Sequence, residues 1–161
     1  MKTSLLHRGI AAALISATLI AAGCGDDEGD GSAGGPLSAD SWRQRVNGFC
    51  ADGYQEATAL PLPQGADRIG PDAVARAEIL ANVRDGVLTL GQPDGIDPAA
   101  VSGYVDELNA DIDQLGEIAD GAEAGDPSAG HTQLDESAGE AATALGLDDC
   151  AALAQAIART P

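Results

Sequence analysis

Few side chains in this sequence of 161 residues are suited to catalysis or to holding a cofactor. Met1 is the only methionine, and His7 and His131 are the only histidines. Haem, zinc and di-iron sites in helical proteins need several His, Met or Cys ligands, or Glu-x-x-His pairs. The chain contains no such pair, no Cys-x-x-Cys-His, no Gly-x-Ser-x-Gly and no glycine-rich phosphate loop. We therefore expect no cofactor and a protein that is not an enzyme.

Calcium is the one metal for which the side chains of this sequence could supply suitable ligands, because it binds carboxylate oxygens. Asn109, Asp111 and Asp113 match the start of an EF-hand loop. That loop needs glycine at its sixth position and glutamate at its twelfth, where this chain has Gln114 and Asp120. We interpret the run as helix surface. Calcium binding is the alternative, with these candidate ligands: Asn109, Asp111, Asp113 and Asp120.

Two further patterns have the residue types of acid-base chemistry. Asp106, Asp113 and Asp120 lie seven residues apart and share a helix face that Glu117 extends, which we interpret as a solvated stripe. His131 has an acidic residue four positions on, Asp135. We interpret this histidine as a packed or boundary residue of a helix.

The N-terminal segment predicts export and a lipid anchor. Residues 2–8 contain Lys2 and Arg8, and residues 10–22 form an apolar run that is too short for a membrane helix. The residues Ala21 to Cys24 resemble the lipobox of bacterial lipoproteins, although that family prefers leucine where this chain has Ala21. The resemblance implies cleavage before Cys24 and lipidation of its thiol. An ordinary secretory signal cut at the same bond is the alternative.

Two cysteines remain if Cys24 carries lipid. Cys50 and Cys150 are then an even number in an exported protein, and we predict that they form a disulfide. A loop of 100 residues would give about 4.7 kcal/mol of stabilisation in the chain-entropy model. Two buried free thiols are the alternative.

Charge and composition restrict the partners. The chain has 26 Asp and Glu residues against 8 Lys and Arg residues, a net charge of −18. Such a chain repels nucleic acids and anionic lipid head groups. We expect no nucleic acid, a membrane reached only through the lipid, and an envelope protein as the possible partner.

The apolar pattern predicts an all-α fold. We expect a signal at 1–23, the lipidated cysteine and a flexible acidic linker at 24–37, and a helical domain at 38–161. Apolar residues recur at helical spacing in four long segments, and no alternating strand pattern is present. The fold expected is therefore an up-down bundle of about four helices plus a short C-terminal helix. The predicted segments run from Ser38 to Leu60, Gly70 to Leu90, Asp97 to Ala124, and Asp126 to Leu145, followed by a short helix that Asp148 or Asp149 caps and that carries Cys150, Leu153 and Ile157. The apolar face predicted for the first segment includes Phe49, and the stripe predicted for the third consists of Val101, Val105, Leu108, Ile112, Leu115, Ala119 and Ala122.

The predicted domain resembles small helical lipoproteins of high-GC actinobacteria. The shared features are the linker, Trp42 and Cys50 on the first helix, and the stretch from Gly146 to Cys150. The resemblance implies no particular activity. We predict a membrane-anchored, extracytoplasmic lipoprotein that is a non-enzymatic binding or accessory module. A lipoprotein that binds a small ligand or a cation such as calcium is the alternative.

Overall fold

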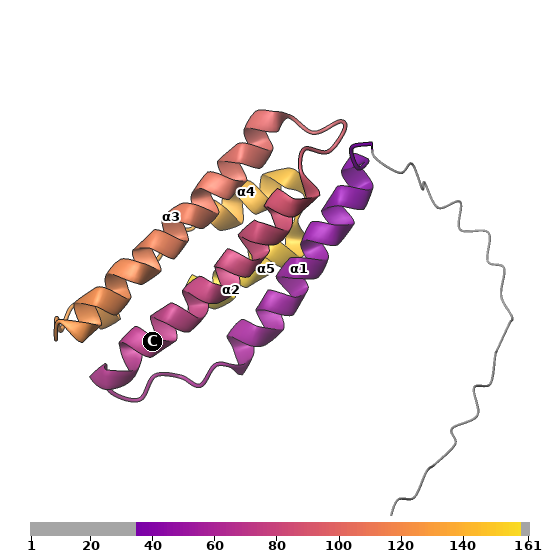
Figure 1. The fold of residues 1–161 in the computed structure, drawn as a ribbon. Coiled ribbons are helices and arrows are strands. Elements are labelled where there is room, and N and C mark those ends of the chain that lie inside the picture. The colour runs from indigo at the N-terminus through magenta and orange to yellow at the C-terminus, as the bar shows by residue number, and fades with distance from the viewer. Residues whose placement is uncertain (1–34, 159–161) are drawn as a thin grey trace, which may run out of the picture. The chain divides into compact units, whose positions relative to one another are not determined.

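The computed structural model describes residues 35–158, and these form an all-α bundle, as predicted (Figure 1). The predicted signal, Cys24 and most of the predicted linker lie outside the described residues. No helix in the described range is long and apolar enough to cross a membrane. The helices are α1 (Ala39–Ala59), α2 (Ile69–Leu90), α3 (Pro98–Glu123), α4 (Ser137–Leu145) and α5 (Asp148–Ala158), with short 3₁₀ turns η1 (Ala66–Arg68) and η2 (Ala129–His131).

The three long helices run alternately up and down, and the two short ones close the bundle. Helix α2 packs most extensively on α3 and also on α1 (Figure 1). Helices α4 and α5 pack against each other, with α4 on α3 and α5 on α1. The bundle is thus completed by a pair of short helices rather than by one long one.

The helix boundaries follow the capping residues that the sequence offers. Ser38 caps α1, and its Oγ accepts a hydrogen bond from the Ser41 amide at 3.3 Å. Asp97 caps α3 in the same manner at Ala99, 3.0 Å away, with Pro98 in the first turn. Gly146 ends α4 in the left-handed conformation with φ of 73°, which glycine adopts without strain.

The core lies between the long helices and the α4–α5 pair. Its fully buried side chains include Trp42 and Val46 of α1, Leu80 of α2 and Leu115 of α3. The prediction placed Phe49 on the buried face of α1, and this is wrong: Phe49 is 37% exposed and Cys50 is buried instead. The face turns toward Cys50 because α1 packs on α5 as well as on α2.

The buried stripe of α3 also differs from the predicted one. Val101, Leu108 and Leu115 of the predicted stripe are buried, but its members Val105, Ile112 and Ala119 are only partly buried. The buried positions are Val101, Tyr104, Leu108, Asp111, Leu115 and Ile118. Both sets have heptad spacing, and because α3 packs on both α2 and α4, its contact surface is wider than one seam. The consequence is that an aspartate occupies a core position.

The prediction of one helix from Asp126 to Leu145 is wrong. Residues 129–131 form η2, and helical structure resumes only at Ser137. The Asp126 carboxylate accepts hydrogen bonds from the amide and hydroxyl of Ser128, which is a local alternative to continuing a helix. Gly130 packs so closely on Ile69 that an added Cβ would lie 2.7 Å from its Cδ1 atom. The chain therefore lies against α2 here as a turn.

A disulfide joins Cys50 of α1 to Cys150 of α5, the pair that the cysteine count predicted. Both residues are buried in the core. The Tyr104 hydroxyl of α3 lies 3.8 Å from the Cys50 sulfur. Because a disulfide sulfur carries no proton, the tyrosine must be the donor in this weak contact.

Side chains of α1 and α2 hold the ends of the two short helices. The Asn47 side chain accepts the amide of Asp149 at the start of α5, at 3.2 Å. Arg76 donates to the last carbonyls of α5, those of Ala156 and Ile157, at 3.1 and 3.2 Å. Its guanidinium is also paired with Asp72 at 2.7 Å, and both side chains are buried.

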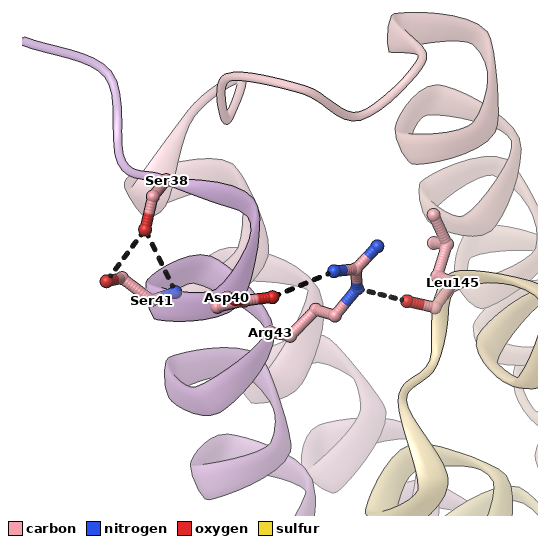
Figure 2. Close-up of polar contacts among 5 residues, drawn as sticks. All are labelled: Ser38, Asp40, Ser41, Arg43 and Leu145. Atoms are coloured by element: carbon pink, nitrogen blue, oxygen red, sulfur yellow. Dashed lines mark hydrogen bonds and ion pairs between the residues drawn. The ribbon is translucent and has the colours of Figure 1, made fainter.

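Arg43 has the corresponding role at the end of α4. Figure 2 shows its guanidinium between the Asp40 carboxylate of α1 and the Leu145 carbonyl. The Nε–O distance to that carbonyl is 2.7 Å. Cations at helix C-termini satisfy carbonyls that have no partner within the helix and interact favourably with the helix dipole.

Loss of the disulfide should destabilise the domain. We expect reduction to lower the free energy of unfolding by about 2–5 kcal/mol, since the bond closes a loop of 100 residues. Unfolding in urea can be followed by the fluorescence of Trp42, the single tryptophan, which is fully buried. An unchanged midpoint after complete reduction would mean that helix packing alone sets the stability.

The buried ion pair should be sensitive to loss of one partner. We expect Arg76→Met to cost about 3–5 kcal/mol, because the Asp72 carboxylate is left buried and unpaired. The double variant Asp72→Asn/Arg76→Met should recover part of this loss. Arg43→Met is the matched control, since its guanidinium is 36% exposed and its partner Asp40 is almost fully exposed. A loss as large in the control as at Arg76 would refute the role of burial.

Candidate functional site

The four calcium candidates lie within one continuous helix and do not converge. Asp111 is buried, whereas Asp113 and Asp120 are exposed. Asn109 accepts a hydrogen bond from the Arg84 guanidinium at 3.2 Å. No group of three His, Cys, Asp or Glu side chains able to hold a metal ion occurs among residues 35–158. The interpretation of this run as helix surface is wrong for Asp111, which faces the core.

His131 and Asp135 also lie apart from any common site. His131 is exposed in η2, so its predicted place on the buried stripe of a long helix is wrong. The Asp135 carboxylate accepts hydrogen bonds from the backbone amide of Ser137, the first residue of α4, at 2.8 Å and from its hydroxyl. These hydrogen bonds from Ser137 lower the pKa of the Asp135 carboxyl.

Asp111 lies at the centre of a second buried polar cluster that reaches across helices, besides the one around Arg76. It is 5% exposed on α3 and shares a small void with Tyr104 of α3, Ala138 of α4 and Cys150 of α5. Glu107, one turn before it, accepts a hydrogen bond from the Ser137 hydroxyl at 2.6 Å. The same hydroxyl lies against Asp135, so its single proton serves two carboxylates.

Burial and like charge shape the acid-base properties of this cluster. Burial is the main cause that raises the pKa of Asp111 from 3.8 to about 6, and the nearby charges of Asp135 and Glu107 make up the rest of this shift. Burial, with a smaller contribution from Asp111, raises the pKa of Tyr104 well above its usual value. The tyrosine is therefore neutral, and Asp111 is the core group that titrates near neutral pH.

Asp111 is held among apolar residues, with no cavity large enough for a substrate. The void at Asp111 measures about 10 Å³, roughly the space for one water molecule. General acid-base catalysis needs a group within hydrogen-bonding reach of its substrate. The Asp111 carboxyl can gain or lose a proton and thereby change the stability of the fold, but a substrate cannot reach it through this void.

The surface has a groove where α2 begins and α3 ends. It measures about 650 Å³, within the range of small-molecule sites. Its floor consists of small and apolar residues of both helices: Gly70, Pro71, Val74, Ala75, Ala119 and Ala122. Its acidic residues are Asp67, Glu78, Asp120 and Glu123, and no basic side chain lines it.

A second groove lies between α4 and α5. It measures about 490 Å³ and carries three acids, Asp135, Glu136 and Glu140. The remainder of its lining is Gly139, Thr143, Ala151, Ala154, Gln155 and Ala158, again without a basic side chain. The described domain therefore presents two acidic grooves, of which the one between α2 and α3 is larger and has the more apolar floor.

Sequence reasoning did not identify either groove or the buried state of Asp111. Of the groove acids, only Asp120 and Asp135 belonged to motifs that the sequence singled out. Gly70, where an added Cβ would lie 3.4 Å from the Ala119 carbonyl, allows the close approach of α2 and α3 beside the larger groove. The sequence signal for this close approach was a glycine at the start of a predicted helix. The spacing of residues could not show which other helix packs against it.

The chain matches no protein-family model, no curated protein and no solved structure. The function is therefore argued from the residues and their geometry.

Replacing the buried acid should stabilise the protein at neutral pH. Because the folded carboxyl binds its proton more tightly than the unfolded one, its contribution to the free energy of unfolding rises as the pH falls from about 7 to about 4. We expect Asp111→Asn to be more stable than the parent at pH 7 by about 1–3 kcal/mol, since one pKa unit is worth about 1.4 kcal/mol. The difference should shrink toward pH 4, as measured by urea unfolding across this range.

The control for this measurement is Asp113→Asn, an exposed change on the same helix. It removes the same charge and should leave both the stability and its pH dependence nearly unchanged. A stability difference between parent and Asp111→Asn that does not vary with pH would contradict the assignment.

Proposed function

We propose that this protein is an extracytoplasmic lipoprotein, anchored to the cell membrane through Cys24, that presents a non-enzymatic binding domain. The observation that carries the proposal is the sequence from Ala21 to Cys24 after a charged and then apolar N-terminal segment. A diacylglyceryl cysteine has two acyl chains, which is the number that stable anchoring requires. The acidic, glycine-rich residues that follow Cys24 suit a tether between a membrane and a folded domain.

The disulfide supports export. Disulfides persist in oxidising compartments and are rare in the cytosol. The Cys50–Cys150 bond lies in the core of the domain and joins its first and last described helices. A domain stabilised in this way is suited to life outside the cytoplasm.

The domain's surface favours binding over chemistry. The buried carboxyl of Asp111 adjoins a void with room for about one water molecule. The grooves of the domain combine acids with small apolar side chains. These features suit recognition of a positively charged or amphipathic partner, and they support a binding or accessory role.

Lipidation can be tested in cells that express the full chain. We expect the protein to incorporate an alkyne analogue of palmitate and to sediment with membranes. Cys24→Ser should abolish both and release the protein into the soluble extracytoplasmic fraction. The controls are Cys50→Ser and Cys150→Ser, which retain Cys24 and should remain labelled. Labelling that persists in Cys24→Ser, or its absence from the parent protein, would refute the anchor.

The accessory role is tested by crosslinking the full-length protein in its own cells and identifying what it captures by mass spectrometry. One dominant envelope protein would support an accessory subunit. The absence of a specific protein partner would contradict that role and favour a small ligand, for which the larger groove offers a site.

A further inference from the structure

We propose that the groove between α2 and α3 binds a small organic cation that carries its charge on an apolar body. This inference deepens the binding role proposed above and rests on it for its biological meaning. The site comprises the first three turns of α2 and the last two turns of α3, which lie side by side at one end of the bundle (Figure 1).

The floor of the groove supplies apolar contact. Val74 is an exposed apolar residue, with 47% of its surface accessible, so its side chain is available to a ligand. Ala119 and Ala122 face it from α3, and Gly70 keeps the two helices close. Small side chains leave a continuous apolar surface rather than filling the space. Burying such a surface gives about 25 cal/mol for each Å² removed from water.

The rim of the groove supplies charge of one sign. Asp67 and Glu78 lie on the α2 side, and Asp120 and Glu123 lie on the α3 side. None of the three ion pairs in the described residues uses a carboxylate of this rim. A ligand seated on the apolar floor is therefore flanked by negative charge.

A bare metal ion does not fit these observations. The carboxylates do not converge into a group of three metal ligands anywhere in the described range. A metal ion would also leave the apolar floor exposed to water. An anionic ligand or a second copy of this chain, with a net charge of −18, would be repelled by the rim. The negative charge of the rim and the apolar surface of the floor together favour an organic cation as the ligand.

The test uses three probes built on a six-carbon chain: hexyltrimethylammonium, hexanol and hexanoate. The protein is the full chain carrying Cys24→Ser, so that no lipid phase takes up the probes. Methyl NMR of labelled alanine and valine reports directly on Val74, Ala119 and Ala122. We expect saturable shifts at these methyls with hexyltrimethylammonium, weaker ones with hexanol and none with hexanoate.

Matched variants separate the groove from the general charge of the protein. Glu78→Gln/Glu123→Gln should weaken binding of the cation about threefold or more, as expected from the loss of two exposed charge pairs. Glu136→Gln/Glu140→Gln removes two charges from the other groove and should leave the affinity nearly unchanged. Val74→Asn, which removes apolar contact without changing charge, should weaken hexyltrimethylammonium and hexanol alike.

The proposal is overturned if the shifts do not saturate, if they centre on α4 and α5, or if both pairs of Glu→Gln changes weaken binding equally. The last result would indicate attraction to net charge alone. Lipid labelling at Cys24 and capture of an envelope protein are measured separately, so they can succeed when this site fails. If neither lipid labelling at Cys24 nor capture of an envelope protein were observed, the proposed function itself would be refuted.

Discussion

The position of α5 is the constraint on which the rest of the bundle depends. A helix of 11 residues is too short to be stable by itself in water. It is held by Asn47 at its start, by the disulfide from Cys50 near that same end, and by Arg76 at its last carbonyls. Each of these groups belongs to α1 or α2. Helix α4, with nine residues, depends on α5 and on Arg43 in the same way.

The scarcity of positive charge explains why this arrangement is needed. The sequence has 8 basic residues against 26 acidic ones, so acids cannot in general be neutralised by pairing. Arg43 and Arg76 are each used twice, for a carboxylate of their own helix and for the carbonyls of a short helix. The contacts of Arg76, and the contact of Arg43 with the Leu145 carbonyl, are partly buried and are therefore screened less than surface pairs. Repulsion among the remaining acids destabilises the compact state. The disulfide opposes this effect because it reduces the conformational entropy that the chain gains on unfolding.

The parts of the fold that sequence predicted are those decided locally. Ser38, Asp97 and Gly146 set helix ends through contacts within a few residues, and these boundaries match the structure. The errors concern which neighbour a helix meets. The helix predicted from Asp126 stops as a turn because Gly130 packs on Ile69, which lies far away in sequence. Phe49 and Asp111 were misplaced because α1 and α3 each contact two other helices.

The candidate sites were less predictable than the fold for the same reason. Spacing placed Asp111 on a helix, but only the packing of α4 and α5 against α3 buries it. Neither groove is encoded by a motif, since each is formed by residues from two separate helices. The cysteine pair is the exception. It was accessible from sequence because two cysteines remain if Cys24 carries lipid, and two cysteines allow one pairing, whatever the intervening fold.

The direction of the chain gives the larger groove a consistent place in a tethered protein. Just before α1, the Leu37 carbonyl accepts a hydrogen bond from the amide of Asp94 in the α2–α3 loop, at 2.8 Å. The start of the helical domain therefore lies beside the C-terminal end of α2. The groove lies at the opposite end of α2, a helix of 22 residues and therefore about 33 Å long. A tether that joins at Ser38 attaches at the end of the bundle remote from the groove. If the proposed anchor holds, the groove and the point where the tether joins the domain are separated by about the length of α2.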